Sequence, residues 1–247
     1  MEKPIVYGMH AVLALLTQTP SPIVQLLCQQ ERQDRRMQQL TEHAQQQNIP
    51  IVWLAKQTLD RKFPNILHQG VVAVCEALPE WGAEDLPRLL ESLDEPAFLL
   101  LLDGVTDPHN LGACLRSADA AGVHAVIAPK AKAVGLTATV RKVACGAAEQ
   151  VPFIQVPNLS QTIEWIKQQG IWVYGFASEA SQSFYQLDTT TAIAWVMGAE
   201  GSGLRRLTRE RCDELVCIPM QGSVASLNVS VATGIACFEV RRQRQLK

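Results

Sequence analysis

The chain has 247 residues, of which 47% are hydrophobic and 19% are charged, and its formal net charge is −2. This composition supports a buried core and excludes a chain that is disordered throughout, because disorder requires few apolar residues and a large net charge. No apolar run reaches the ~18 residues that a membrane-spanning helix needs, and the first residues lack the apolar stretch of a secretion signal. We therefore expect a cytoplasmic protein with no membrane segment, whose seven cysteines are reduced.

Residues 1–77 are predicted to form a small α/β unit of their own. Apolar residues recur at helical spacing in two stretches, and three short apolar runs are typical of strands. Residues 78–95 then carry several acidic residues and two prolines, which is typical of a linker, here with a short helix over 87–93. The elements expected before this linker are a helix over 10–17, a strand over 23–28, a helix over 34–46, and strands over 51–54 and 71–75.

From residue 96 to 247, short apolar runs alternate with stretches of helical periodicity. Such alternation favours a parallel sheet covered by helices on both faces. Ligands of these sheets bind at the carboxyl ends of the strands, so we expect a site in the loops after Leu102, Met197 and Ile218. The expected strands cover 98–102, 124–128, 171–176, 192–197 and 215–218, and the expected helices cover 111–121, 138–145, 159–169 and 227–241.

The loop after the strand over 98–102 runs from Asp103 to Asn110 and leads into a helix. Asn110 is placed to cap that helix, because an asparagine side chain can accept a free N–H of the first turn. Arg116 lies about 150° around the helix from its apolar stripe, so its side chain is expected to face away from the sheet. A capped helix with an exposed arginine that pairs with Asp119 explains the same pattern without any chemistry.

The loop after the strand over 192–197 has glycines at 198, 201 and 203. Glycines at the end of a strand allow the backbone to approach a ligand closely. Their spacing matches neither the dinucleotide motif GxGxxG nor the nucleoside triphosphate motif GxxxxGK[ST], so it supports neither ligand. Glu200 within this turn is able to accept a hydrogen bond from an amine or a hydroxyl, or it is merely solvated.

The loop after the strand over 215–218 leads through Ser226 into the last helix. Ser226 is placed to cap this helix, whose free N–H groups favour a carboxylate or a phosphate. Capped glycine loops are common, but three polar loops at the same ends of strands indicate a composite pocket for a small molecule. The residues alone identify neither this molecule nor a reaction. The predicted core face of the last helix comprises Leu227, Val231, Ile235 and Phe238.

Three stretches of this region resemble the three motifs of the SpoU, or TrmH-type, class of SPOUT RNA ribose 2′-O-methyltransferases. They are DPHNLGACLRSADAAG at 107–122, VMGAEGSGL at 196–204 and IPMQGSVASLNVSVA at 218–232. In the first unit, YGMHAV at 7–12 and HQGV at 68–71 are similar to the L30e-like RNA-binding domain that precedes this catalytic domain. Within the class, the chain most resembles enzymes that modify a guanosine of 23S ribosomal RNA, in the P-site loop of the peptidyl-transferase region.

The resemblance implies both a fold and a reaction. The catalytic domain, residues 96–247, would be an α/β sheet with a deep trefoil knot, and the protein would act on RNA as a homodimer. S-adenosyl-L-methionine would donate a methyl group to a ribose 2′-oxygen, with no metal involved. Carried over to this sequence, the cofactor contacts fall on Gly198, Glu200, Gly201, Ile218, Met220 and Leu227. The catalytic residues fall on Asn110, Arg116, Glu200, Ser226 and Asn228.

Other functions remain open at this point. A tRNA ribose methyltransferase of the same fold would carry the same motifs, because these contact the cofactor and the ribose rather than the surrounding RNA. A non-catalytic RNA-binding factor of ribosome assembly would be expected to lose Arg116 or the glycine loop, and both are present. A Rossmann-type methyltransferase is disfavoured because no GxG turn follows the strand over 98–102, and the five histidines show no metal-ligand spacing.

Overall fold

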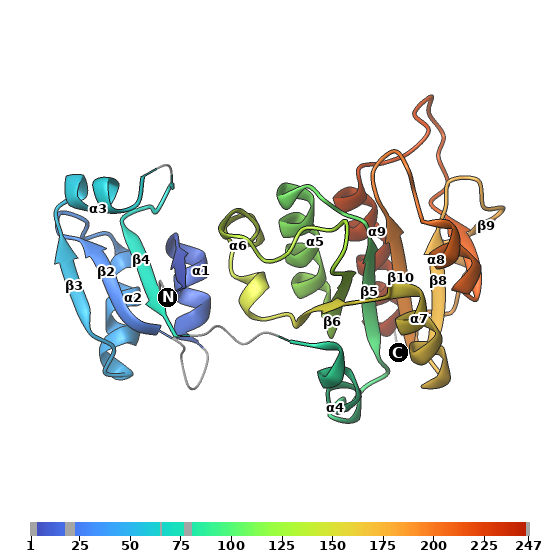
Figure 1. Ribbon diagram of the computed structural model, residues 1–247, viewed down its shortest axis with the longest axis horizontal. Coiled ribbons are helices and arrows are strands. Elements are labelled where there is room, and N and C mark those ends of the chain that lie inside the picture. Colours follow the sequence, from blue (N-terminus) through green and yellow to red (C-terminus); the bar gives the residue numbers. More distant parts are fainter. Residues whose placement is uncertain (1–3, 18–22, 65, 77–80, 246–247) are drawn as a thin grey trace.

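The computed structural model describes residues 4–17, 23–64, 66–76 and 81–245. They form two units that lie side by side along the longest axis of the molecule (Figure 1). The N-terminal unit is built on a four-stranded sheet and the C-terminal unit on a seven-stranded sheet. The predicted α/β fold class is confirmed, whereas the domain boundaries at 77 and 96 and the trefoil knot stay predictions.

The N-terminal unit packs helices on both faces of its sheet. Its elements are β1 (Ile5–Tyr7), α1 (Met9–Leu16), β2 (Ile23–Gln29), α2 (Arg35–Gln46), β3 (Ile51–Leu54), α3 (Lys56–Lys62) and β4 (Val71–Cys75). The strands run in the order β1-β4-β2-β3, with β2 and β3 parallel and the other pairs antiparallel. Leu15 of α1 and Leu40 of α2 are buried on one face, and Leu59 of α3 is buried on the other.

Residues 81–95 lie against the C-terminal unit. Trp81 forms a parallel bridge with Ile154, and it is followed by η1 (Ala83–Asp85) and α4 (Leu86–Glu91). The helix predicted over 87–93 therefore lies over 86–91. Leu86 is buried in the same apolar cluster as Ile154, so this segment contributes to the core of the C-terminal unit.

The C-terminal unit is a parallel sheet in the order β7-β6-β5-β10-β8-β11-β9. Its strands are β5 (Phe98–Asp103), β6 (Ala125–Pro129), β7 (Phe153–Val156), β8 (Trp172–Phe176), β9 (Gln182–Ser183), β10 (Ile193–Gly198) and β11 (Glu214–Cys217). Because all paired strands run in the same direction, their carboxyl ends lie at one edge of the sheet, which we call the carboxyl edge. Their amino ends lie at the opposite edge, which we call the amino edge.

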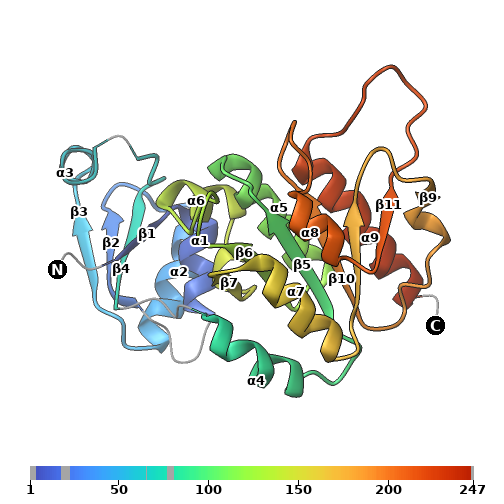
Figure 2. The same ribbon diagram turned by 45° about the vertical axis from the view of Figure 1, so that its right-hand side comes forward.

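Helices cover both faces of this sheet (Figures 1 and 2). One face is covered by α5 (Pro108–Ala121), α6 (Ala138–Ala144) and α9 (Val229–Gln245), whose apolar residues share a cluster with Phe98, Leu100 and Leu102. The other face is covered by α4 and α7 (Leu159–Gln168), with α8 (Arg206–Arg211) beside α7. Two single turns, η2 (Ala147–Glu149) and η3 (Phe184–Gln186), complete the unit. Burial on both faces explains why β5 is an uninterrupted apolar run that ends in one acidic residue.

Both predicted helix caps beside the site are wrong. The helix after β5 begins at Pro108, and the Asp107 side chain caps it by accepting from His109 N at 3.0 Å. Proline favours the first helical position because it has no N–H to leave unpaired, so Asn110 lies inside the first turn. The last helix begins at Val229 rather than 227, and Asn228 Oδ1, not Ser226, accepts from Ser230 N at 2.9 Å.

The predicted core face of α9 is also wrong in part. Val231 and Phe238 are each 51% exposed. The buried positions are Val229, Thr233, Ala236, Cys237, Glu239 and Val240. This helix carries apolar residues on two sides, so helical periodicity alone does not show which side packs on the sheet.

The two units touch through α1 and β1 on one side and α6 and η2 on the other. Gln150 Nε2 donates to Ala14 O at 3.1 Å. A Cβ atom on Gly146 would lie 2.8 Å from Ala14 Cβ, so a glycine at this position lets the backbones approach closely.

Candidate active site

The carboxyl edge holds a cavity of about 390 Å³ between three loops. In the sheet β8 lies between β10 and β11, so the loops that leave these strands are neighbours. They line the cavity with residues 176–179, residues 197–204 and several residues between 217 and 227. We call this space the glycine-loop cavity. The long loop between β11 and α9 rises above the sheet beside it (Figure 1).

The loop after β10 folds back on itself to form one wall of the glycine-loop cavity. Ala199 N donates to Gly203 O at 3.1 Å, and Gly203 N donates to Ala199 O at 2.9 Å. Gly201 and Gly203 have φ angles of 80° and 65°, which glycine adopts without strain. A Cβ atom on Gly198 would lie 2.2 Å from the carbonyl carbon of Gly203. The tight turn therefore requires glycine at 198 and leaves backbone groups at the cavity wall.

Three of the predicted catalytic residues meet at this loop and form a polar cluster of Asn110, Asn228 and Glu200. Asn228 Nδ2 donates to Asn110 Oδ1 at 3.0 Å and lies 3.5 Å from Glu200 Oε2. Asn110 Nδ2 donates to the same Glu200 oxygen at 3.3 Å. Asn228 Oδ1 accepts from the N and Oγ of Ser230, which fixes the orientation of its amide. The cluster joins the loops after β5, β10 and β11, which are far apart in sequence.

All the residues predicted to bind the cofactor line the glycine-loop cavity. Ile218, Met220 and Leu227 supply apolar side chains, and the turn after β10 supplies backbone groups. Apolar walls with a few polar groups suit the adenosyl part of S-adenosylmethionine, and the narrow turn at Gly198 makes a cradle that a Cβ atom would fill. Their contact with the cofactor stays a prediction. The set comprises Gly198, Glu200, Gly201, Ile218, Met220 and Leu227.

The structure does not bring the remaining two predicted catalytic residues into the polar cluster. Ser226 is exposed and lines the glycine-loop cavity. Arg116 is exposed on α5, and its Nη1 lies 3.6 Å from Cys145 Sγ, at the end of α6. It faces away from the sheet, as predicted. It contacts a thiol rather than Asp119, and among the described residues no carboxylate pairs with its guanidinium.

Asp103 and Arg205 form a link that the sequence analysis missed. Asp103 is the last residue of β5, and its side chain is buried. Its Oδ2 accepts a hydrogen bond from Arg205 N at 2.8 Å, and its Oδ1 lies 3.5 Å from Arg205 Nε. Arg205 Nη2 also reaches the carbonyl oxygens of Ala131 and Lys132. The hydrogen bonds of Asp103 and Arg205 thus join the loops after β5, β6 and β10. An acidic residue that ends an all-apolar strand was the available signal.

The loop after β8 was also missed, although its strand was predicted. It places Glu179 on the glycine-loop cavity, where the carboxylate pairs with Nη1 of Arg209 from α8. That hydrogen bond lowers the pKa of the Glu179 carboxyl, which is therefore ionised at neutral pH. The parallel order of the strands was the available signal, because every strand of such a sheet ends at the same edge.

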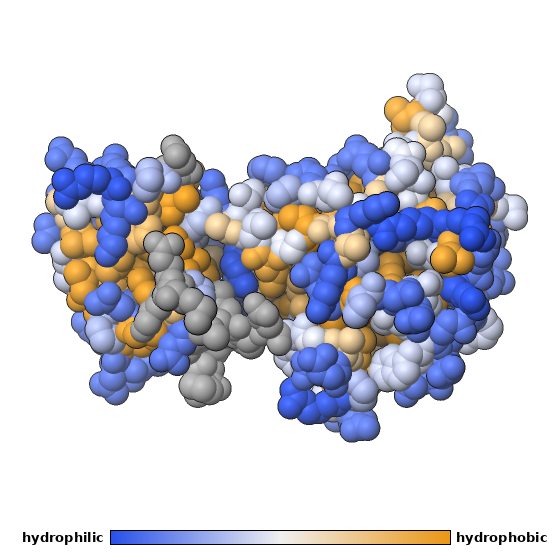
Figure 3. All heavy atoms as spheres, in the orientation of Figure 1, coloured by the Kyte–Doolittle hydropathy of each residue, from blue (hydrophilic) through white to orange (hydrophobic). Residues whose placement is uncertain are grey.

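The arginine cluster around α8 is a solvated helix face. Arg206 pairs with Glu210, Arg209 with Glu179, and Arg211 with Glu164. Figure 3 shows hydrophilic side chains gathered over this helix. Because carboxylates already neutralise these cations, the cluster offers no dense positive surface.

The described part of the chain holds neither a group of metal-ligating side chains nor a helix able to span a membrane. Among residues 4–17, 23–64, 66–76 and 81–245, no three His, Cys, Asp or Glu side chains are grouped so that they could hold a metal ion. None of the described helices combines the length and the apolar character needed to cross a membrane.

Two family models match the chain. Residues 97–238 match the SpoU rRNA Methylase family, and residues 5–81 match the family described as RNA 2'-O ribose methyltransferase substrate binding. A 23S rRNA (guanosine-2'-O-)-methyltransferase RlmB from Escherichia coli K12 is 53% identical over 240 residues, which cover 97% of this chain and 98% of that protein. The RlmB of Coxiella burnetii is likewise 53% identical, over 97% of this chain and 96% of its own.

Solved structures agree with this placement. The SpoU methyltransferase AviRb from Streptomyces viridochromogenes, in complex with the cofactor AdoMet, aligns with a TM-score of 0.80 and 26% identity, over 98% of this chain and 91% of its own. A TrmH/SpoU tRNA modifying enzyme of A. aeolicus aligns with a TM-score of 0.57 and 30% identity, over 66% of this chain and 84% of its own. The similarity to AviRb extends over both units, whereas the tRNA enzyme matches about two thirds of the chain.

Proposed function

The chain belongs to the SpoU rRNA Methylase family, and we propose that it transfers a methyl group from S-adenosylmethionine to a ribose 2′-oxygen of a guanosine in 23S ribosomal RNA. The observation that carries this proposal is the polar cluster of Asn110, Glu200 and Asn228 beside the glycine-loop cavity. Side chains able to position a sugar hydroxyl lie there next to a pocket suited to the methyl donor. A ribosomal RNA substrate also implies a cytoplasmic location.

The cofactor, when bound, supplies a methyl group on a positively charged sulfur that is already a good electrophile. The 2′-oxygen attacks in line, so the O–C bond forms as the C–S bond breaks. The protein's main tasks are then to align the two reactants and to manage the hydroxyl proton. Glu200 accepts both amide N–H groups of the polar cluster and so orients Asn110 and Asn228. In this proposal Ser226, which lines the cavity from the exposed loop, positions the ribose or shapes the cofactor pocket.

Arg116 has a different role in this proposal. A guanidinium offers five N–H donors and no acceptor, so it is a poor general base. It is instead suited to hold a phosphate of the RNA and to stabilise negative charge that develops on the 2′-oxygen. The exposure of Arg116 and the absence of a carboxylate partner among the described residues support this role.

We also propose that the protein acts as a homodimer. Val231 and Phe238, seven residues apart on one side of α9, leave half of their surfaces exposed, and an apolar patch of this kind is suited to contact a second copy of the chain. A second copy that covers α9 would bring both subunits close to the RNA site. Light scattering coupled to gel filtration of the wild type and of Phe238→Lys tests this: the variant should be monomeric, and a wild-type monomer would refute it.

The variant Arg116→Ala tests the assignment of the site. It should lower the rate of methyl transfer by at least ~100-fold, in the range known for loss of a residue that stabilises transition-state charge. Binding of S-adenosylhomocysteine, measured by calorimetry, should stay within twofold of the wild type, because Arg116 lies outside the glycine-loop cavity. Substantial residual turnover would remove Arg116 from the catalytic residues.

The substrate is tested in cells. Ribose methylation is mapped in ribosomal and transfer RNA from cells with and without this protein. We expect one guanosine of 23S ribosomal RNA to lose its methyl group while the transfer RNA stays unchanged. Loss of a transfer RNA methyl group instead would assign the tRNA activity, and no loss in either RNA would favour a non-catalytic factor.

A further inference from the structure

Arg116 lies close to the contact between the two units. On α5, Gly112 packs so closely against α6 that a Cβ atom there would lie 2.6 Å from Val143 Cβ. Arg116 follows Gly112 by four residues, so it projects from the same side of α5, toward the end of α6. There its Nη1 lies 3.6 Å from Cys145 Sγ. The orientation of the guanidinium therefore depends on where the end of α6 lies.

The chain turns sharply where α6 ends. Cys145 and Gly146 are successive residues with positive φ angles, of 53° and 101°. Cys145 N donates to Lys142 O at 3.3 Å, which closes the last turn of α6. Gly146 then lies against α1 of the N-terminal unit, because a Cβ atom on it would lie 2.8 Å from Ala14 Cβ. One residue of this turn thus contacts Arg116, and the next packs against the N-terminal unit.

An ion pair joins the two elements on either side of this turn. Arg141, on α6, donates to Glu149 Oε1, on η2, at 2.7 Å, and the two side chains are only 14% and 1% exposed. A charge-assisted hydrogen bond in such a buried position holds α6, the turn and η2 together as one piece. Gln150 Nε2, next to η2, donates to Ala14 O at 3.1 Å. A movement of α1 is therefore passed on to Arg116 through this piece.

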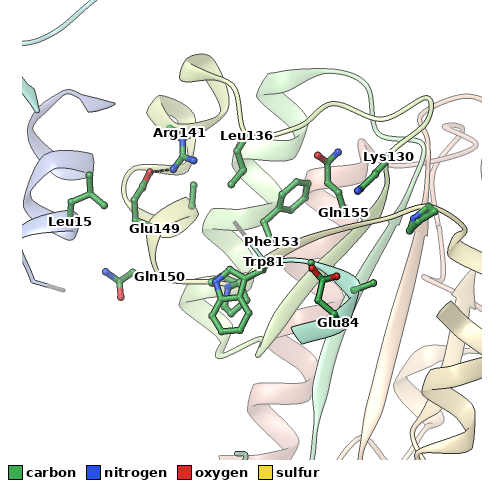
Figure 4. A pocket seen from close by; sticks show the side chains of 16 residues that line it. Leu15, Trp81, Glu84, Lys130, Leu136, Arg141, Glu149, Gln150, Phe153 and Gln155 are labelled. Carbon is green, nitrogen blue, oxygen red and sulfur yellow. Dashed lines mark hydrogen bonds and ion pairs between the residues drawn. The ribbon is translucent and has the colours of Figure 1, made fainter. Parts of the chain in front are cut away.

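The contact between the units is local, because a cavity of about 470 Å³ lies beside it (Figure 4). Leu15 of α1 lines this cavity on one side, and Arg141, Glu149 and Gln150 line it on another. It shares none of its described lining residues with the glycine-loop cavity. Open space beside a small contact leaves room for the two units to shift relative to each other.

We propose that Cys145 and Gly146 are positioning residues, through which the N-terminal unit sets the orientation of Arg116. While α1 rests on Gly146, Cys145 Sγ accepts a hydrogen bond from the guanidinium, and displacement of α1 removes this acceptor. RNA that is bound to both units keeps α1 in place. The inference rests on the proposed function in one respect, that Arg116 acts in catalysis. It predicts that changes at this turn lower the rate of methyl transfer and leave cofactor affinity unchanged.

The first test removes the sulfur atom. The rate of methyl transfer is measured in a single turnover, with full-length protein saturated with S-adenosylmethionine and an unmodified 23S ribosomal RNA transcript made in vitro. Cys145→Ala should lower this rate about fivefold, as expected for the loss of one hydrogen bond. Cys145→Ser keeps an acceptor at the same position and should recover most of the rate. The dissociation constants for RNA and for S-adenosylhomocysteine should stay within twofold of the wild type in both variants.

The second test disturbs the contact with α1. Gly146→Ala places a methyl group 2.8 Å from Ala14 Cβ and should lower the rate about tenfold, because overpacking displaces the turn. Gly170→Ala is the matched control. It adds the same methyl group at a φ of 77°, where nothing lies within 4 Å, so it carries the backbone strain without the contact. Its rate should stay within twofold of the wild type.

The third test asks whether the two contacts act together. Ala14→Leu enlarges the side chain that faces Gly146 and leaves the backbone of the turn unstrained, and it should lower the rate about fivefold. In the Cys145→Ala background the same change should lower the rate less than twofold, because both substitutions then act on one interaction. A purely structural effect of Ala14→Leu would instead be independent of Cys145.

Four outcomes would overturn the proposal. They are a Cys145→Ala rate within twofold of the wild type, a Gly146→Ala rate no lower than that of Gly170→Ala, full effects of Ala14→Leu in the Cys145→Ala background, and a loss of S-adenosylhomocysteine affinity in parallel with the rate. If Gly146→Ala does not fold, the comparison of Ala14→Leu in the two backgrounds decides the matter.

The failure of this inference is distinguishable from the failure of the proposed function. A wild type that methylates no RNA, or an Arg116→Ala variant that keeps substantial turnover, would contradict the proposed function or the role of Arg116 in it. If Arg116→Ala abolishes methyl transfer while the variants at Cys145, Gly146 and Ala14 behave like the wild type, only the positioning role is wrong.

Discussion

The two edges of the seven-stranded sheet differ in what their polar groups do. At the carboxyl edge, polar side chains from different loops bind one another around a cavity, as Asn110, Glu200 and Asn228 do. At the amino edge, polar side chains bind the backbone that enters the strands. Side chains suited to bind a ligand and side chains that stabilise the fold therefore lie at opposite ends of the same strands.

Arg244 is the clearest case at the amino edge. Its guanidinium donates to the carbonyl oxygens of Pro96 at 2.8 Å, Thr191 at 2.9 Å, Ala97 at 3.2 Å and Thr189 at 3.3 Å. It also lies over the ring of Phe98, 5.4 Å from the centroid. One side chain near the end of α9 therefore holds the segments that lead into β5 and β10.

The largest effect on binding is expected from Gly198→Ala. The added Cβ atom would lie 2.2 Å from the backbone of Gly203, so the turn after β10 has to open. Overpacking of this kind costs the folded state up to ~3 kcal/mol, which the turn relieves in part by opening. Because the opened turn no longer shapes the cavity wall, affinity for S-adenosylhomocysteine should drop by about 100-fold, the equivalent of that same cost. Calorimetry measures the affinity, and chemical denaturation measures the free energy of unfolding, which should fall by less than ~3 kcal/mol.

Gly222→Ala provides the control for that comparison. It adds the same methyl group to the loop after β11, where nothing lies within 4 Å of the new atom. Its cofactor affinity should stay within twofold of the wild type. If both variants lost affinity equally, the tight turn at Gly198 would not be the feature that shapes the cavity.

The largest effect on stability is expected from Arg244→Ala. Hydrogen bonds from charged groups contribute about 1.5–3 kcal/mol each. In the variant, water hydrogen-bonds some of the carbonyl oxygens that Arg244 leaves, so we expect the free energy of unfolding to fall by about 3 kcal/mol in total. Affinity for S-adenosylhomocysteine in the folded variant should be normal. Arg241→Ala, at an exposed position of the same helix, is the control and should change stability by less than ~0.5 kcal/mol. A variant that stayed fully stable would show that Arg244 does not hold together the segments that lead into β5 and β10.

The sequence predicted the carboxyl edge better than the amino edge for a physical reason. Glycines at 198, 201 and 203 and polar residues after predicted strands are local signals, and parallel topology brings them together without knowledge of side-chain contacts. Arg244 instead lies in a short basic run with Arg241 and Arg242, and this composition indicates no partner for it. Its partners are backbone carbonyls up to about 150 positions away, and backbone carbonyls carry no sequence signal.

The errors at the site have a similar origin. Asn110 and Ser226 were assigned as caps because their residue types suit that position, yet Asp107 with Pro108 and Asn228 fill those roles. Capping depends on where the helix begins, which is uncertain by one or two residues from periodicity alone. Glu179 was missed because its loop has no glycine motif, and only the strand order β10-β8-β11 places it at the cavity.

A smaller effect is expected from a pair of matched substitutions, Asp103→Asn and Asp213→Asn. Asp103 accepts from Arg205 N at the carboxyl edge, and Asp213 accepts from Val173 N, at 2.8 Å, at the amino edge. Asp103→Asn should loosen the loop after β10 and weaken S-adenosylhomocysteine binding about tenfold, the effect of losing one charge-assisted hydrogen bond. Asp213→Asn should lower stability by about 1–2 kcal/mol and leave binding unchanged. Equal effects of both variants on binding would contradict the division between the two edges.

The smallest effect is a pH dependence at Glu239, a buried carboxylate of α9 near the amino edge. Hydrogen bonds from Arg242, at 2.8 and 2.7 Å, lower the pKa of this carboxyl below its ordinary value of 4.5. A carboxyl whose pKa is lowered by folding stabilises the folded state above the unfolded pKa, and that stabilisation is lost as the pH falls through the folded pKa.

Glu239→Gln should therefore be less stable than the wild type at pH 7, by about 1 kcal/mol. The difference should shrink as the pH falls below 4.5, when the wild-type carboxyl takes up its proton. Chemical denaturation at pH 7 and at pH 3.5 measures both values, with Glu210→Gln of the exposed Arg206 pair as the control. A difference that stayed constant between the two pH values would show that packing, rather than charge, accounts for the contribution of Glu239.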